Sequence, residues 1–223
     1  MTPPAVRPTS TIAEIAYGLE RLLLLLRAQA WRSHGAPGLH PAQQALLGLL
    51  ANTDDGLRIG EIAERLGISS ASVSDSVTAL ETKRLVSRGP DPADARSTRV
   101  RLTRRGRSHA RSARGADTAA ARLIARLPDR DQAALLRSLQ LLIHQAQVQG
   151  LATGLRTCLG CRHFRPYASG DPAMPHVCAF LGTPFGDADL RTDCADSEPE
   201  LPERAAETVA RFRDPTSAHA EGR

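Results

Sequence analysis

The stretch Ile59–Val86, IGEIAERLGISSASVSDSVTALETKRLV, predicts two short helices joined by a tight turn. The first helix spans residues 61–66 and ends at Gly67, because glycine readily adopts the left-handed conformation that follows a helix. A serine pair then caps a second helix over about residues 71–85, since a serine hydroxyl accepts a hydrogen bond from a free N–H at a helix start. Apolar residues at helical spacing form the inward stripe of this second helix: Val73, Val77 and Leu80.

A β-hairpin is predicted directly after the second helix. Val86–Arg88 is strand-like, residues 89–95 are rich in turn formers, and residues 98–103 alternate between polar and apolar side chains. A short strand-like segment, Leu57–Ile59, precedes the first helix. Two helices about a glycine-containing turn form a helix-turn-helix. The hairpin that follows makes the predicted fold a winged helix.

The protein is basic, and its positive charge is concentrated around the hairpin. The 223 residues carry a formal net charge of +5, which favours a polyanionic partner, although an excess of this size also keeps proteins soluble. Eleven basic residues stand against Asp91 and Asp94 in this region: Lys83, Arg84, Arg88, Arg96, Arg99, Arg101, Arg104, Arg105, Arg107, Arg111 and Arg114. Double-stranded DNA is therefore the predicted partner.

The second helix and the hairpin carry the side chains that DNA recognition needs. A helix in the major groove needs short polar groups that reach base edges, and a wing needs basic groups for phosphates or the minor groove. The predicted base-facing residues are Ser70, Ser72, Ser74, Asp75, Ser76 and Thr78. The predicted wing and phosphate contacts are Lys83, Arg88, Asp94, Arg96, Arg99 and Arg101, together with Arg104 and Arg105. The alternative to a recognition helix is an ordinary serine-rich amphipathic helix. The alternative to a DNA contact by Arg96 is a charged side chain in a solvated loop.

These segments resemble the multiple antibiotic resistance regulator (MarR) family of winged-helix repressors. The resembling segments are Ile59–Ile68, the helix Ser70–Leu85 with its ending Leu80–Val86, and the wing Asp91–Ser97. The most family-specific element is Asp94-x-Arg96-Ser97, followed by Val100-x-Leu102-Thr103. The similarity spans about residues 10–149.

The resemblance implies a homodimeric repressor whose two recognition helices read the half-sites of a pseudo-palindromic operator. It also implies that Arg96 enters the minor groove and that Asp94 steadies it, because a narrow A·T groove attracts arginine and a nearby carboxylate orients a guanidinium. Many members of the family release DNA when a small lipophilic effector binds between the dimer helices and the DNA-binding lobe. His34 and His40 are candidates for facing that cleft, although surface or capping roles are favoured for both.

The predicted fold class is mainly α with a small β-hairpin wing. Only 3% of the residues are aromatic, so the core is expected to consist of aliphatic side chains in packed helices. We predict a MarR-like domain over residues 10–149, with a DNA-binding lobe over 41–103 between helices over 10–35 and 104–149. The second helical region is expected to break at Pro128-Asp129. The apolar stripe of the first helix suits either a core helix or a dimer helix.

The C-terminal part has a different composition. Cys158, Cys161, Cys178 and Cys194 are the only cysteines of the chain, in the pattern C-x2-C-x16-C-x15-C. Four thiolates in a reducing compartment favour a metal site over disulfides. We predict a small metal-binding module with four cysteine ligands over residues 155–200, stabilised by the metal because it has little apolar material. A short helix around residues 203–212, within a tail over 201–223, is expected to follow.

Two metals suit these cysteines. Zinc ribbons usually carry two C-x-x-C pairs, and this chain has one, so a [4Fe-4S] cluster is slightly favoured over Zn²⁺. His163 and His176 are alternative ligands, and Phe164, Phe180 and Phe185 are candidates for shielding a cluster. Such a module would let the regulator sense redox state or iron by changing the spacing of its recognition helices.

Other classes of function have less support. The alternative is a thiol- or metal-dependent redox protein or enzyme that uses Cys158 and Cys161, but the βαβ context of such a motif is missing. No catalytic residues are predicted, because the sequence has no nucleophile triad or phosphate-binding glycine loop. Without a signal peptide or an apolar run long enough to span a bilayer, the protein is expected to be cytoplasmic, with no membrane partner.

Overall fold

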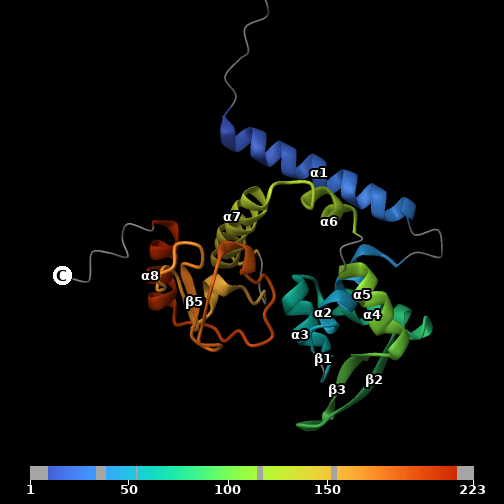
Figure 1. Ribbon diagram of the computed structural model, residues 1–223. Coiled ribbons are helices and arrows are strands. Elements are labelled where there is room, and N and C mark those ends of the chain that lie inside the picture. The colour runs from blue at the N-terminus through green and yellow to red at the C-terminus, as the bar shows by residue number, and fades with distance from the viewer. Residues whose placement is uncertain (1–9, 34–38, 54, 115–117, 152–154, 215–223) are drawn as a thin grey trace, which may run out of the picture.

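Figure 1 shows a long N-terminal helix, a lobe with a projecting hairpin, and a C-terminal module of short strands. The computed structural model describes residues 10–33, 39–53, 55–114, 118–151 and 155–214. Its elements are α1 (Thr11–Ser33), α2 (Pro41–Leu50), β1 (Leu57–Arg58), α3 (Ile59–Leu66), α4 (Ser70–Thr82), β2 (Val86–Asp91), β3 (Asp94–Leu102), α5 (Arg104–Arg114), α6 (Ala119–Ile124), α7 (Asp129–Val148), η1 (Cys158–Gly160), β4 (Phe164–Arg165), β5 (His176–Cys178), β6 (Thr183–Phe185), η2 (Asp187–Asp189) and α8 (Pro202–Arg213).

The lobe from α2 to α5 is a winged helix. Its strands form a three-stranded antiparallel sheet of order β1-β3-β2. The predicted inward stripe of α4 is confirmed, because Val73, Val77 and Leu80 are fully buried. They belong to one aliphatic core that also holds Leu46, Leu47, Ile62 and Val100.

Local signals set the turn between α3 and α4. Gly67 has a φ of 64° and ends α3, as predicted. Ser69 is the cap of α4, and its Oγ accepts a hydrogen bond from the N–H of Ser72 at 3.2 Å. The predicted end of this helix near Leu85 is wrong. The helix ends at Thr82, and Arg84 turns with a φ of 59°, so that Leu85 enters the core and β2 can begin.

The hairpin is longer than predicted. Residues 89–95 were expected to form the turn, but β2 extends to Asp91 and β3 starts at Asp94. The ladder pairs Gly89 with Arg99 and Pro90 with Thr98, followed by a register shift. Pairing across the hairpin thus overrides the weak strand preference of glycine and proline, and it carries the wing tip away from the lobe (Figure 1).

Helix α1 lies across one end of the molecule, where it contacts α6 (Figure 1). Most of its predicted apolar stripe is exposed, including Ile12, Ile15, Leu19, Leu22 and Leu23. A core role within a single chain is therefore wrong for these side chains. The region 104–149 is also divided more than expected, into α5, α6 and α7, although the predicted break before Asp129 is confirmed.

The C-terminal module has its own small core. Its three strands form an antiparallel sheet of order β4-β5-β6. The core contains Leu159, Phe164 and Leu190 from the cysteine-rich segment, together with Val209 and Phe212 from α8. The expectation of little apolar material therefore needs correction, because α8 completes the module and supplies its fully buried Phe212.

The module is anchored on α7. Gln140 is fully buried, and its Nε2 donates to the carbonyl of Arg191 at 2.9 Å. Arg137 donates to the carbonyl of Phe212, and its guanidinium lies 4.0 Å from the centre of the Phe212 ring. These contacts join the cysteine-rich segment and α8 to the same helix.

Candidate nucleic-acid interface and cysteine cluster

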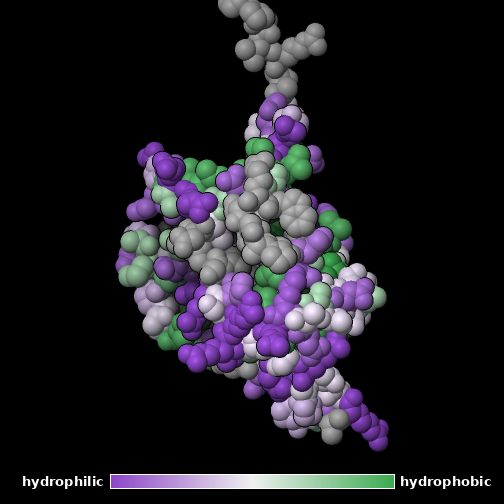
Figure 2. Space-filling view, turned by 90° about the vertical axis from the view of Figure 1, so that its right-hand side faces the viewer, coloured by the Kyte–Doolittle hydropathy of each residue, from purple (hydrophilic) through white to green (hydrophobic). Residues whose placement is uncertain are grey.

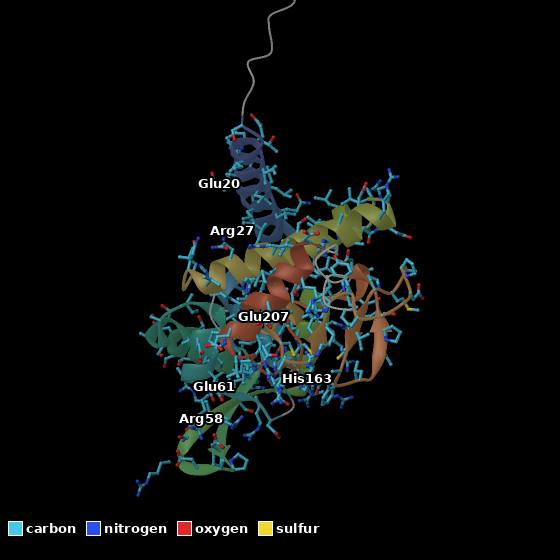
Figure 3. All side chains as sticks on the ribbon, turned by 90° about the vertical axis from the view of Figure 1, so that its left-hand side faces the viewer. Glu20, Arg27, Arg58, Glu61, His163 and Glu207 are labelled. Carbon is cyan, nitrogen blue, oxygen red and sulfur yellow. The ribbon has the colours of Figure 1, made fainter. Side chains whose placement is uncertain are left out.

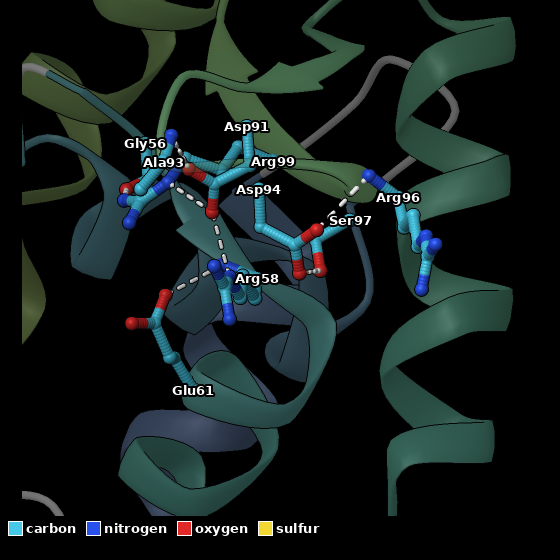
Figure 4. A network of polar contacts seen from close by, with 9 residues as sticks. All are labelled: Gly56, Arg58, Glu61, Asp91, Ala93, Asp94, Arg96, Ser97 and Arg99. Atoms are coloured by element: carbon cyan, nitrogen blue, oxygen red, sulfur yellow. Dashed lines mark hydrogen bonds and ion pairs between the residues drawn. The ribbon is translucent and has the colours of Figure 1, made fainter.

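A buried carboxylate holds the base of the hairpin (Figure 4). Asp91 is 3% exposed, and its Oδ2 lies 2.6 Å from Nε of Arg58 and 2.9 Å from Nε of Arg99. Its Oδ1 accepts the N–H of Ala93 at 2.9 Å. One side chain therefore ties β2 to β1 and β3. We call Asp91, Arg58 and Arg99 the wing root.

The protonation state of Asp91 is set by these partners. The N–H of Ala93 and the guanidinium of Arg58 lower the pKa of Asp91 to about 2, against the opposing effect of burial. Asp91 also raises the pKa of Arg58. Asp91 is thus ionised throughout the neutral range, and its charge is neutralised within the protein by the paired arginines.

Asp94 acts on the backbone of the wing turn. Its Oδ1 accepts the N–H of Arg96 at 3.1 Å, and the Ser97 hydroxyl donates to its Oδ2 at 2.6 Å. The Ser97 hydroxyl and the Arg96 N–H both lower the pKa of Asp94. The Arg96 side chain extends away from Asp94 and is exposed (Figure 4). Asp94 therefore shapes the turn from which Arg96 projects.

Arg99 is placed differently from its sequence prediction. We expected a phosphate contact, but its guanidinium pairs with Asp91 and donates to the carbonyl of Gly56 at 2.8 Å. Arg58 and Asp91 were missing from the predicted site altogether. Their only signal was an arginine in a predicted strand and an aspartate in the predicted turn of the hairpin, and their pairing depends on strand register.

The polar face of α4 is open to solvent. Among its predicted base-facing residues, Ser70, Ser72, Asp75 and Thr78 are exposed, and Ser74 and Ser76 are half-buried. Arg88 reaches back from β2 and donates to Oγ1 of Thr78 at 3.1 Å. The exposed helix face and the hairpin thus form one continuous polar surface, which we call the reading face.

Two further predicted residues lie beside the reading face. Lys83 donates from Nζ to Oε1 of Gln43 on α2 at 3.1 Å, so its ammonium is held beside that helix. Arg101 lies in β3 opposite Ser87 and is half-buried. Figure 2 shows hydrophilic residues gathered over the lower part of this face of the molecule and at the tip of the projecting hairpin.

The lobe also matches a known family in sequence. Residues 38–97 match the model described as the MarR family. The match runs from before α2 into the wing and contains Asp91, Asp94 and Arg96. The winged-helix lobe is thus MarR-like in sequence as well as in fold. Among curated proteins, none matches the chain closely enough to count as a relative.

Solved structures share this architecture. The transcriptional repressor CouR bound to a 23-mer DNA duplex is 29% identical, with a TM-score of 0.51 over 62% of this chain and 99% of that chain. CouR from Rhodococcus jostii RHA1 bound to p-coumaroyl-CoA is 23% identical, with a TM-score of 0.52 over 60% of this chain and 95% of that chain. Streptococcus pneumoniae FabT in complex with DNA is 16% identical, with a TM-score of 0.53 over 63% of this chain and 99% of that chain. More than a third of this chain lies outside each match.

The four cysteines converge in the C-terminal module. Cys158, Cys161, Cys178 and Cys194 all line one cavity of about 60 Å³, and none forms a disulfide. Burial raises the pKa of the Cys158 thiol to about 11. A reactive thiol needs a lowered pKa, so this environment disfavours the alternative in which Cys158 is a redox nucleophile.

The two histidines of the module differ in their surroundings. His176 is fully buried, its Nε2 lies 2.9 Å from Oδ1 of Asp187, and its Nδ1 accepts the N–H of Tyr167. Both ring nitrogens are therefore engaged, which excludes His176 as a ligand in this arrangement. His163 lines the cysteine cavity, with its Nε2 3.4 Å from Oε1 of Glu198. In Figure 3 it lies in the module, while Arg58 and Glu61 belong to the lobe.

Two features are absent from the described residues. Among them, no group of three or more His, Cys, Asp or Glu side chains is arranged to hold a metal ion. None of the helices in the described ranges is long and apolar enough to cross a membrane.

Proposed function

We propose that the chain is a DNA-binding transcriptional repressor of the MarR type, which binds a pseudo-palindromic operator as a homodimer. The observation that carries this proposal is the hairpin itself. A buried carboxylate between two arginines fixes its base, while Arg96 stays exposed on its turn and the polar face of α4 is open to solvent. CouR, which is 29% identical, is described as a repressor bound to a DNA duplex.

We expect different parts of the reading face, and the start of α5, to contact different parts of the DNA. The short polar side chains of α4 suit base edges in the major groove, where each base pair presents a distinct set of donors and acceptors. Arg96 suits a narrow minor groove, whose negative potential attracts a guanidinium. The basic residues at the start of α5, Arg104 and Arg105, are exposed and suit phosphates, which hold the register without specifying sequence.

A second copy of the chain is the proposed partner of α1. The large apolar side chains of this helix, from Ile12 to Leu25, are 41–79% exposed, and a row of this kind is costly to leave in water. Operator half-sites related by a two-fold axis require two recognition helices related in the same way. Association through α1 would supply that symmetry.

A cavity between the lobe and α7 is the proposed effector site. It measures about 760 Å³ and is lined by Glu64 and Arg65 of α3, by His144 and Gln147 of α7, and by the start of the cysteine module. Among the described residues, Nη1 of Arg65 is buried without a hydrogen-bond partner, which favours an anionic ligand. Loss of duplex binding on addition of p-coumaroyl-CoA, the ligand of the similar CouR, would support this site, and unchanged binding over the soluble range would count against that ligand class.

The test of DNA binding starts from a selection of random duplexes on the purified full chain. Arg96→Ala should then weaken binding to the selected operator by about 1–3 kcal/mol, that is, about 5- to 150-fold, and should relax the preference for A·T pairs at the wing position. Arg130→Ala is the matched control, because Arg130 is 87% exposed on α7, outside the reading face. The proposal fails if the wild-type chain selects no sequence, or if both variants bind equally well.

A further inference from the structure

We propose that the cavity lined by the four cysteines holds a [4Fe-4S] cluster, and that loading of this cluster is communicated to the winged-helix lobe through Asp193. The first part concerns the module alone. The second part rests on the proposed DNA-binding function.

The size of the cavity favours a cluster over a single ion. Four thiolates on one tetrahedral zinc lie about 2.3 Å from the metal and therefore about 3.8 Å from one another. All four thiols line one cavity of about 60 Å³, although no group of three or more His, Cys, Asp or Glu in the described part of the chain is arranged to hold a metal ion as it stands. That space holds roughly four to six waters, at about 10–15 Å³ each. In a cubane each thiolate binds a different iron, so the ligands stand further apart around a larger core.

The lining of the cavity suits a cluster. Phe164, Phe180, Phe185 and Leu181 line it together with the cysteines, so much of the wall around the sulfur atoms is apolar. Water exclusion and hydrogen bonds to sulfur are the means by which proteins tune iron–sulfur centres. The N–H of Arg191 donates to Sγ of Cys158 at 3.2 Å, and the N–H of His163 donates to Sγ of Cys161 at 3.5 Å.

An unsatisfied hydroxyl gives independent support. Thr157 is 2% exposed and lines the same cavity, and its Oγ1 has no hydrogen-bond partner among the described residues. A buried hydroxyl without a partner costs about 1–3 kcal/mol, so such groups normally have one. A thiolate or sulfide sulfur in the cavity would accept its hydrogen bond.

Asp193 links the cluster site to the lobe. It precedes Cys194, and its Oδ2 accepts a hydrogen bond from Nδ2 of Asn52, which follows α2, at 2.7 Å. Arg156, two residues before Cys158, holds the other oxygen with Nε and Nη2 at 3.0 and 2.9 Å. The N–H of Cys194 donates to the carbonyl of Arg156. Movement of the Cys158 or Cys194 segment on loss of the cluster therefore displaces a partner of the winged-helix lobe.

The cluster is tested on the full chain, purified without air and reconstituted with ferrous iron and sulfide. The expected result is about four irons and four sulfides per chain, with a sulfur-to-iron charge-transfer band in the visible spectrum. Cys178→Ser should lower the iron content. Thr157→Val should keep the iron and lower the reduction potential, whereas Thr157→Ser should keep both, because it keeps the donor. One zinc per chain and a colourless protein would overturn the proposal.

Communication is tested by comparing operator affinity with and without the cluster. We expect the two forms of the wild type to differ at least about fivefold, and Asn52→Ala to abolish the difference while leaving the visible spectrum unchanged. Asp55→Asn, an exposed position on the same loop, should keep the difference. Equal affinities of the two wild-type forms would make the module a structural support only. Failure of the wild type to bind any duplex would instead reject the proposed function and leave the spectroscopic result standing.

Discussion

At the scale of single residues, Asp91 decides how the wing is held. It is nearly buried, and it is shared by Arg58 and Arg99, which come from two other strands. Removal of one partner from a buried ionic cluster leaves the remaining charges without an opposite charge beside them. The two arginines would then turn to solvent, and the hairpin would lose its fixed direction.

The wing root predicts a specific response to acid. The pKa of Asp91 is lowered to about 2 in the folded chain, from about 3.9 in an unfolded one, so its contribution to stability is present in full above about pH 5 and is lost as the pH falls towards 2. Asp91→Asn should unfold at a lower denaturant concentration than the wild type at pH 7, and this difference should shrink between pH 4 and pH 2. Denaturant midpoints over this range check the prediction. A difference independent of pH would contradict it.

At the scale of elements, α5 is seated directly on the segment that follows α4. Thr103 precedes α5, and its Oγ1 accepts the N–H of Gly106 at 3.0 Å and donates to the carbonyl of Leu85 at 3.1 Å. Gly106 is buried against the same segment, and a Cβ at this position would lie 1.9 Å from the carbonyl oxygen of Leu85. The close approach of these two backbones requires glycine.

Gly106→Ala should therefore destabilise the lobe by about 1–3 kcal/mol, because either backbone must shift to admit the methyl group. Gly60→Ala is a matched control in α3, where no atom lies within 4 Å of the added Cβ and alanine has the higher helix propensity. Thermal unfolding of both variants measures the contrast. Equal melting temperatures would show that the α5 contact is looser than the structure indicates.

At the scale of the whole molecule, α1 lacks a covering surface in the single chain. Its apolar residues Leu22, Leu23, Leu24 and Leu25 are 43–58% exposed. Acidic and basic side chains, such as Glu20 and Arg27, lie along the same helix (Figure 3). A helix with this composition is stabilised when another apolar surface covers it.

Leu22→Glu should shift the chain from dimer to monomer and weaken operator binding, since a monomer reaches one half-site only. Met174→Glu is the control, because Met174 is similarly exposed in the C-terminal module. Sedimentation velocity gives the oligomeric state, and a duplex titration gives the affinity. A monomeric wild type, or a dimeric Leu22→Glu variant with full affinity, would contradict the proposed role of α1.

The sequence by itself determined the local part of the winged helix. Gly67, the serine cap of α4 and the stripe from Val73 to Leu80 act through backbone conformation and contacts within a few residues, so their effects can be read along the chain. The exposed polar face of α4 followed from the same periodicity, whereas Arg96 followed from the resemblance of the wing to the MarR family. Four cysteines in one segment also indicated a common site before any fold was available.

Only the tertiary structure decided which distant groups meet. Arg58 and Arg99 converge on Asp91 because the register of β1, β3 and β2 brings them together. Arg99, for which the sequence predicted a phosphate contact, therefore pairs with Asp91 in the folded chain. The packing of the module on α7 likewise joined Asp193 to Asn52, 141 residues away. Such pairings depend on strand register and on the packing of whole elements, whereas sequence signals act over about one helical turn or one strand.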